Sequence, residues 1–347
     1  MTFANRNRGG SGTYARSLLG SLQTADGITA YEVAGPARSD FVGTLRWLSG
    51  GARATLQRQP PDLLHCPSFV VPWRLPVPFV ATVHDAGVWR NPADHPLEWR
   101  VYDRRLLPSR LRAASRVIVG SEFARLEVVD GYRLESDRVV AVPYGIESGF
   151  FAVAASPTSS PSGNLLFPGA PVGRKNLGLV LRAMAGAVPA GALGRARLDI
   201  SGARAADFSA ETAMISSLGL EKRVSWLGQV AAEAMPALLA GAGAVVYPSL
   251  YEGFGFPALE ALAAGTPVVA SNRGSLPEVL GDAALLIDPT SVGQLVEALE
   301  AVLSRPQLRS SLVEKGRQRA RRFTWEKCAE GTTAVYRSVL NELHDHG

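Results

Sequence analysis

Short apolar runs alternate with segments of helical periodicity along most of the chain, and the alternation is most regular after residue 163. Apolar runs bounded by turn residues predict strands buried on both faces, and apolar positions spaced three and four residues apart predict helices. The predicted strands of this part cover 164–167, 196–201, 223–227, 244–247, 267–270 and 284–287. The predicted helices cover 177–188, 210–218, 232–240, 257–264, 276–280 and 292–303. Such an alternation predicts βαβ units around a parallel sheet.

The first part of the chain follows the same alternation less regularly. Its predicted helices cover 13–22, 98–112 and 122–129, and its predicted strands cover 29–33, 63–65, 79–83 and 116–119. Only 2–4 could form a strand ahead of the first helix. We therefore predict an α/β fold of two doubly wound parallel-sheet domains with a crevice between them. Such sheets bind ligands beyond the carboxyl ends of their strands.

A change in composition divides the chain into two parts of similar size. The segment 152–163 reads Ala-Val-Ala-Ala-Ser-Pro-Thr-Ser-Ser-Pro-Ser-Gly, and small polar residues with proline cannot form a core. The length of 347 residues also suits two domains of roughly 150 residues. We predict an N-terminal domain at 1–150, a linker at 151–163 and a C-terminal domain at 164–324.

Composition and charge narrow the classes of protein. The 46% of hydrophobic residues excludes a disordered chain, and the net charge of +5 is too small for a dedicated nucleic-acid binder. The isoelectric point of about 9.4 favours anionic partners. Cys66 and Cys328, the two cysteines, predict reduced thiols in a cytoplasmic protein. No apolar signal segment opens the chain, and prolines and glycines interrupt the uncharged run 234–251, which favours helix, turn and strand over a membrane span.

The strongest chemical signal follows the predicted strand 244–247. Gly253 and Gly255 let a ligand approach the backbone just before the next predicted helix. Pro257 suits the first turn of that helix, and Gly265 suits the position that closes it. The unpaired N–H groups and the positive dipole end of such a helix start predict an anion site, most naturally for phosphate.

Two carboxylates, Glu252 and Glu260, frame this predicted site. A carboxylate beside a phosphate is unfavourable unless it accepts hydrogen bonds from hydroxyl groups, and sugars supply such groups. Taken alone, Glu252 could be a solvent-exposed loop residue, and Glu260 could be a helix-start carboxylate that the dipole favours. Together with the glycines, the pair favours a site for a sugar phosphate.

The stretch Glu252-Gly253-Phe254-Gly255-Phe256-Pro257, followed by Glu260 at E-x7-E spacing, resembles the signature of the retaining nucleotide-sugar glycosyltransferases of family 4. Ser-Leu-Pro-Glu at 275–278 and Gly-Asp-Ala-Ala-Leu-Leu-Ile-Asp-Pro at 281–289 agree with this resemblance, which covers nearly the whole chain. It implies the GT-B fold, two Rossmann-like domains facing across a cleft, with the last helix at 325–347 returning to the N-terminal domain.

The resemblance also implies roles for the residues of this motif. It implies that Glu252 contacts hydroxyls of the donor sugar and that Glu260 holds the ribose of the nucleotide. It further assigns donor binding to the four residues that directly follow Glu252, which are Gly253, Phe254, Gly255 and Phe256.

Gly173-Arg174-Lys175-Asn176 follows the first predicted strand of the second domain. The planar fork of Arg174 and the point charge of Lys175 can neutralise a diphosphate. The alternative is a solvated basic helix start, although cations are unfavourable at a helix N-terminus. Members of the family usually carry an Arg and a Lys here that hold the leaving diphosphate, and Lys175 matches that Lys. Ala170 stands where many members have the Arg, and Arg174 fits a subgroup with Arg-Lys-Asn.

Gly9-Gly10-Ser11-Gly12-Thr13 opens the first predicted helix and matches neither a phosphate-binding P-loop nor a dinucleotide fingerprint. By itself it could be a plain tight turn. The resemblance implies a loop over the cleft near the donor phosphates, and Gly10 and Gly12 are the candidates.

Val83-His84-Asp85 ends a predicted strand of the first domain, where the carboxyl end of the sheet meets ligands. A lone His is more often structural, but members of the family often have a His here near the transferred sugar. His84 could hydrogen-bond a sugar hydroxyl or support the developing charge. Asp85 could orient His84 or contact the acceptor.

Basic residues gather on the predicted helix 98–112. A solvated face is the default interpretation, and contact with anionic lipid headgroups is the alternative if the acceptor is lipid-linked. These residues are Arg100, Arg104, Arg105, Arg110 and Arg112.

The predicted activity is metal-independent transfer of a hexose from a nucleotide diphosphate sugar to a glycan or lipid-linked acceptor. No Asp-x-Asp triplet occurs, which argues against the metal-dependent GT-A type. The resemblance implies retention of the anomeric configuration, no cofactor and no metal, and it favours mannosyl or rhamnosyl donors linked to GDP, UDP or dTDP. No enzymatic nucleophile emerges, so front-face transfer is the expected route. The alternatives are a GT-B nucleotide-sugar epimerase and a catalytically silent binding protein, and the predicted location is the cytoplasm or the inner membrane face.

Overall fold

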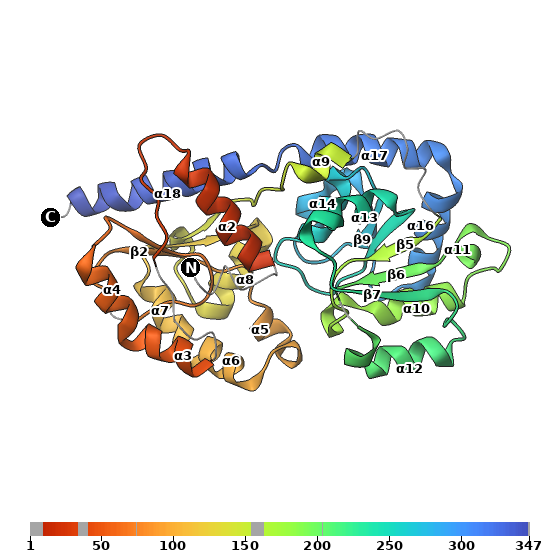
Figure 1. The fold of residues 1–347 in the computed structure, drawn as a ribbon, viewed down its shortest axis with the longest axis horizontal. Helices are drawn as coiled ribbons and strands as arrows, with labels where there is room; N and C mark the ends of the chain where they lie inside the picture. The colour runs from red at the N-terminus through yellow and green to blue at the C-terminus, as the bar shows by residue number, and fades with distance from the viewer. Residues whose placement is uncertain (1–9, 34–40, 74, 154–162, 203, 346–347) are drawn as a thin grey trace. The chain divides into compact units, whose positions relative to one another are not determined.

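The computed structural model describes residues 10–33, 41–73, 75–153, 163–202 and 204–345. The chain forms two compact units: unit 1 is Met1–Gly145 with Phe323–Gly347, and unit 2 is Ile146–Arg322. Each unit is an α/β domain built on its own all-parallel sheet (Figure 1). The predicted class of two parallel-sheet α/β domains is therefore confirmed.

The described residues of unit 1 form four strands in the order β1-β2-β3-β4. The strands are β1 (Leu64–Cys66), β2 (Phe79–Thr82), β3 (Arg116–Val119) and β4 (Val139–Ala141). The α-helices are α2 (Gly10–Gln23), α3 (Phe41–Arg46), α4 (Ala52–Arg58), α5 (Gly87–Arg90), α6 (Leu97–Val101), α7 (Leu107–Ala113), α8 (Glu122–Tyr132) and α18 (Trp325–Asp345). Short π and 3-10 turns cover Trp47–Gly51, Pro92–Asp94, Tyr102–Leu106 and Ser136–Arg138.

Three features of the described part of unit 1 differ from the sequence prediction. The predicted strand at 29–33 is not among the strands that the described residues form, and Thr29 and Tyr31 line a cavity. Strand β4 was missed, although an apolar run covers 139–142 between Arg138 and Pro143. The predicted helix 98–112 is present, but a π-helical segment at 102–106 joins α6 to α7. The predicted strand at 2–4 lies outside the described residues.

In the part of unit 2 that the structure describes, six parallel strands lie in the order β10-β9-β8-β5-β6-β7. The strands are β5 (Leu165–Phe167), β6 (Leu198–Ser201), β7 (Val224–Gly228), β8 (Ala244–Tyr247), β9 (Val268–Ser271) and β10 (Leu285–Ile287). The α-helices are α9 (Gly149–Val153), α10 (Leu177–Ala185), α11 (Ala192–Arg195), α12 (Ser209–Ser217), α13 (Met235–Gly241), α14 (Phe256–Ala263), α15 (Leu276–Leu280), α16 (Val292–Ser304) and α17 (Pro306–Ala320). Short 3-10 turns cover Gly173–Lys175, Ala205–Asp207, Ala232–Ala234 and Gly281–Ala283.

The strand order of unit 2 reverses between β5 and β8, which is the topological switch point of a doubly wound sheet. Every residue of β5, β8 and β9 is buried, as expected for central strands covered on both faces. Helix α10 packs on α12 and α16, and α14 packs on α13 and α17 (Figure 1). The loops after β5 and β8 therefore meet at the one edge where such a sheet binds ligands.

Helix α14 begins and ends at the glycines that the sequence singled out. Gly255, with φ +92°, precedes the helix, and a Cβ there would lie 2.6 Å from Leu276 Cδ2. At the other end Gly265 has φ +76°, and its N–H donates to the Leu262 carbonyl at 3.1 Å. The Thr266 N–H donates to the Ala261 carbonyl at 2.9 Å. These two hydrogen bonds together form a Schellman motif.

The chain leaves unit 1 between Gly145 and Ile146, ahead of the predicted linker 151–163. The physical reason is that Ile146 and Phe150 are buried apolar residues, which composition averaged over a window does not reveal. Helix α9, which includes Phe150, packs on α13 and α14 and so belongs to unit 2. The chain returns at Phe323, and α18 packs on α2 in unit 1.

Candidate active site

The switch point of unit 2 brings three of the predicted site residues together. Arg174 and Lys175 follow β5, and Glu252 follows β8. The Oε1 atom of Glu252 accepts hydrogen bonds from Lys175 Nζ at 2.6 Å and from Arg174 Nη1 at 2.9 Å. The three side chains form one ion-pair cluster with two positive charges and one negative charge.

Burial and charge act in opposite directions on Glu252. Burial raises the pKa of the carboxyl, while Lys175 and Arg174 lower it, and the net pKa lies below the ordinary value. Glu252 is therefore ionised at neutral pH although only 7% of it is exposed. If either Arg174 or Lys175 is removed, the Glu252 carboxylate keeps the other as its partner. A buried carboxylate without any positively charged partner would be strongly unfavourable.

Backbone contacts hold the two loops against each other. The Leu250 N–H donates to the Arg174 carbonyl at 2.7 Å, and Arg174 Nη1 donates to the Tyr251 carbonyl at 3.1 Å. Asn176, in the left-handed conformation with φ +59°, donates its amide to the carbonyls of Pro248 at 3.2 Å and Pro289 at 2.8 Å. Asn176 thus links the loops after β5, β8 and β10, a role that sequence reasoning missed.

The Ser-Leu-Pro-Glu segment at 275–278 holds the backbone of Glu252 through hydrogen bonds from Ser275. The backbone N–H and the hydroxyl of Ser275 both donate to the Glu252 carbonyl, at 3.1 Å and 3.0 Å. Gly274 has φ +68°, and a Cβ there would lie 2.9 Å from that same carbonyl oxygen. The sequence indicated this segment only as part of the family resemblance; the structure shows that it holds the backbone of Glu252.

The remaining predicted donor residues lie on or beside α14. Gly253 and Phe254 are buried in the loop, and Phe256 is the first helical residue, with the two phenyl ring centroids 5.1 Å apart. Glu260 lies in the second turn and is partly buried. Burial, and secondly the charge of Glu147, raise the pKa of Glu260 to about 7. This carboxyl therefore titrates near neutral pH, unlike Glu252.

His84 and Asp85 follow β2 in unit 1. Burial lowers the pKa of His84 to about 4, although the Asp85 charge and a backbone hydrogen bond to Pro67 raise it. The imidazole is therefore neutral at pH 7, which suits a hydrogen bond better than charge support. Its Nδ1 lies 3.0 Å from the hydroxyl of Tyr144, which sequence reasoning left without a role. Asp85 accepts a hydrogen bond from the Gly87 N–H at 2.7 Å, next to the start of α5.

Gly10 and Gly12 belong to the first turn of α2, where Gly12 is buried. Two residues further along the helix, Tyr14 packs edge-on against His84 with ring centroids 5.2 Å apart. The helix that carries Gly10 and Gly12 therefore contacts His84 through Tyr14. Gly10, Gly12, His84 and Asp85 are residues of unit 1, and the other candidates are residues of unit 2.

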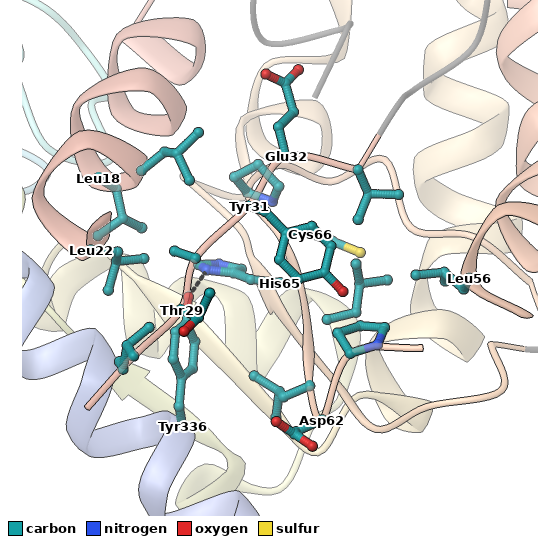
Figure 2. A pocket seen from close by; sticks show the side chains of 18 of the residues that line it. Leu18, Leu22, Thr29, Tyr31, Glu32, Leu56, Asp62, His65, Cys66 and Tyr336 are labelled. Atoms are coloured by element: carbon teal, nitrogen blue, oxygen red, sulfur yellow. Dashed lines mark hydrogen bonds between the residues drawn. The ribbon is translucent and has the colours of Figure 1, made fainter. Parts of the chain in front are cut away.

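Unit 1 also contains a cavity of about 530 Å³. Figure 2 shows Leu18 and Leu22 of α2, Leu56 of α4 and the imidazole of His65 facing it. His65 Nδ1 is hydrogen-bonded to the Tyr336 hydroxyl of α18 (Figure 2). None of the predicted site residues lines this cavity, so the candidate site is elsewhere.

Comparisons with known proteins agree with this arrangement. Residues 155–319 match the family model of the glycosyl transferases group 1, and residues 8–149 match that of glycosyltransferase family 4. The O-antigen chain mannosyltransferase B of Escherichia coli is 32% identical over 285 residues, which cover 79% of this chain and 74% of that protein.

Solved structures agree in fold. Sucrose-phosphate synthase from Thermosynechococcus elongatus is similar with a TM-score of 0.77 at 23% identity, covering 96% of this chain and 94% of the other. HepE of Anabaena, solved in complex with UDP and glucose, is similar with a TM-score of 0.73 at 18% identity, covering 96% and 97%. The chain thus belongs to the group 1 and family 4 glycosyltransferases, and it is a glycosyltransferase with the GT-B fold.

Proposed function

We propose that the protein transfers a hexose from a nucleotide diphosphate sugar to a glycan or lipid-linked acceptor, with retention of configuration and without a metal ion. The observation that carries the proposal is the ion-pair cluster of Arg174, Lys175 and Glu252 at the switch point of unit 2. These side chains lie at the carboxyl ends of β5 and β8, where such a sheet binds ligands. The two cations supply positive charge for a diphosphate, and the carboxylate can accept hydrogen bonds from the hydroxyl groups of the attached sugar.

In this proposal Arg174, Lys175 and the N-terminus of α14 stabilise the negative charge that develops on the leaving diphosphate. Glu252 accepts hydrogen bonds from hydroxyls of the donor sugar, and Glu260 accepts them from the ribose. The C1–O bond to the phosphate breaks, the acceptor oxygen bonds to C1 on the same face, and an oxygen of the leaving phosphate takes the proton of the acceptor hydroxyl, as front-face transfer requires. Neutral His84 hydrogen-bonds a hydroxyl of the transferred sugar, and Asp85 contributes on the acceptor side.

Mannose is the favoured hexose, with rhamnose second. The name of the Escherichia coli relative, a mannosyltransferase, supports mannose, and the UDP and glucose bound to HepE support a nucleotide sugar as donor. No cofactor is part of the proposal, because the nucleotide sugar is a substrate.

The deciding experiment is a panel of GDP-mannose, UDP-glucose, UDP-galactose and dTDP-rhamnose with the purified protein and candidate glycan and lipid-linked acceptors. We expect acceptor-dependent release of one nucleoside diphosphate and a new glycosidic bond with the anomeric configuration of the donor. Epimerisation of a nucleotide sugar without transfer would establish the epimerase alternative. Donor binding without any turnover would establish a silent binding protein.

We further propose that the protein works in the cytoplasm at the inner face of a membrane, with 97–112 as its contact surface. Leu97 and Val101 are 64% and 51% exposed, and Arg105 and Arg112 are exposed on the same helical run. Apolar side chains flanked by arginines suit the boundary between anionic headgroups and acyl chains. None of the helices in the described ranges combines the length and hydropathy that crossing a bilayer requires.

Replacing both Arg105 and Arg112 by Glu is expected to lower the partition coefficient onto phosphatidylglycerol vesicles, measured by sedimentation, by about 30-fold or more, at roughly 1 kcal/mol for each of the two lost positive charges. Vesicles of phosphatidylcholine alone provide the uncharged reference. The control is Arg321→Glu with Arg322→Glu, an equal change in net charge at exposed positions of unit 2. Equal sedimentation of the two double variants would refute the assignment of this surface.

A further inference from the structure

Tyr247 is the last residue of β8 and the last residue before the loop that carries Glu252. The strand is otherwise apolar, Ala244-Val245-Val246, and it pairs with β5 on one side and β9 on the other. Tyr247 is 1% exposed. A phenol hydroxyl at such a buried strand end requires hydrogen-bond partners, because an unsatisfied polar group there is unfavourable.

The side chains that interact with Tyr247 are Lys175 and Glu252 of the candidate site. Lys175 Nζ donates a hydrogen bond to the Tyr247 hydroxyl and lies 4.2 Å from the centroid of its ring. The Glu252 carboxylate accepts from the same Lys175 Nζ at 2.6 Å, and its charge raises the pKa of Tyr247. Burial, with the Glu252 charge second, raises the pKa of Tyr247 well above its ordinary value, so the phenol keeps its proton. It can therefore donate to the carboxylate while it accepts from the ammonium.

We propose that Tyr247 is a positioning residue, which fixes the Lys175 ammonium and the Glu252 carboxylate at the spacing that the donor requires. The inference rests on the proposed function, in which Lys175 stabilises the leaving diphosphate. Lysine has a flexible four-carbon stem with about 2 kcal/mol of rotamer entropy. The ring of Tyr247 lies under the ammonium and its hydroxyl holds Nζ, so this entropy is lost in folding rather than at the transition state.

The hydroxyl also limits how Lys175 pairs with Glu252. An ammonium and a carboxylate at 2.6 Å form a closed ion pair that competes with the substrate for both charges. A third group that donates to the carboxylate and accepts from the ammonium weakens that competition on each side. This role requires the phenol oxygen, since the aromatic ring alone offers neither a donor nor an acceptor of this kind.

Tyr247→Phe keeps the ring and removes only the hydroxyl. We expect kcat for nucleotide release to fall by about tenfold, the usual effect of losing one hydrogen bond to a charged group, with little change in the KM of the acceptor. In a Lys175→Met background the same change is expected to have almost no further effect, because Tyr247 acts through Lys175. Independent, multiplying effects of the two substitutions would overturn the proposal.

Tyr132→Phe is the matched control. Tyr132 is a buried tyrosine of unit 1 whose hydroxyl donates to the buried Asp103 carboxylate at 2.9 Å. Its removal tests what loss of a buried phenol hydroxyl does to folding alone, and kcat per folded molecule is expected to stay at the wild-type value. A merely structural Tyr247 would behave like Tyr132.

A second measurement does not depend on turnover. Acetic anhydride in limiting amount acylates lysines, and peptide mass spectrometry gives the rate at Lys175. We expect this rate to rise severalfold in Tyr247→Phe and to be unchanged in Tyr132→Phe. A wild-type rate in Tyr247→Phe would refute the positioning role. If the wild-type protein releases no nucleotide from any donor, the proposed function fails, and the labelling still decides whether Tyr247 holds Lys175.

Discussion

Replacement of Lys175 by Met is expected to lower kcat for nucleotide release by about 10²–10³-fold, the usual effect of losing one group that stabilises charge in a transition state. Met fills a similar volume but carries no charge, so the negative charge on the leaving diphosphate loses one of its two side-chain cations. Steady-state kinetics with the donor that the panel identifies gives kcat and KM separately. We expect the loss mainly in kcat, because this charge develops as the bond breaks.

The Lys175→Met variant is expected to fold, because Glu252 keeps its hydrogen bond from Arg174 at 2.9 Å. Lys315→Met is the control: Lys315 also pairs with a carboxylate, Asp282, at 2.8 Å, but at the exposed surface of unit 2. An exposed pair of this kind contributes little to stability, and nothing in the proposal gives it a role in transfer. A kcat for Lys175→Met close to that of Lys315→Met would contradict the assignment.

The elements around the site could be predicted because their signals are local. The run at 244–247 is apolar and bounded by turn residues, and it is strand β8 at these same residues. Helix α14 begins and ends where the backbone preferences of Gly255, Pro257 and Gly265 place its ends. These preferences do not depend on residues distant in the sequence. The predicted helix 276–280 also matches α15.

The coupling within the site could not be predicted in the same way. The sequence motif assigned Glu252 to sugar hydroxyls, and Arg174 and Lys175 to the diphosphate, as separate roles. Their hydrogen bonds join residues 77 and 78 positions apart, and they form because β5 and β8 are neighbours in the sheet. Strand order depends on how the whole domain packs, and no local pattern contains it.

Unit 1 shows the same limit. The residues at 29–33 are predicted as a strand, yet the strands of the described residues do not include them, and they line a cavity. Tyr144 carried no signal in the sequence, yet its hydroxyl bonds His84 and its ring fills the space that Gly120 leaves. A Cβ at Gly120 would lie 2.5 Å from that ring, so the glycine and the tyrosine are matched to each other.

Replacement of Gly145 by Ala is expected to destabilise unit 1 by more than about 3 kcal/mol, an effect typical of severe overpacking. A Cβ at Gly145 would lie 2.3 Å from the Trp325 nitrogen and 2.5 Å from the Thr324 carbonyl carbon. Both are backbone atoms at the start of α18, so no side-chain rotation relieves the clash. Relief requires α18 to move, which exposes the buried side chains of Trp325 and Cys328.

The matched control for Gly145→Ala is Gly149→Ala, four residues further along the chain. A Cβ at Gly149 would meet no atom within 4 Å, so this variant tests the entropic effect of replacing a glycine without any clash. Thermal unfolding followed by circular dichroism compares the two, and at about 2–4 °C per kcal/mol Gly145→Ala is expected to melt roughly 10 °C below Gly149→Ala. The distinguishing quantity is the difference between the variants. If the two variants have the same melting temperature, α18 moves away from Gly145 at little cost in free energy. The close approach of the two backbones then does not hold this helix on unit 1.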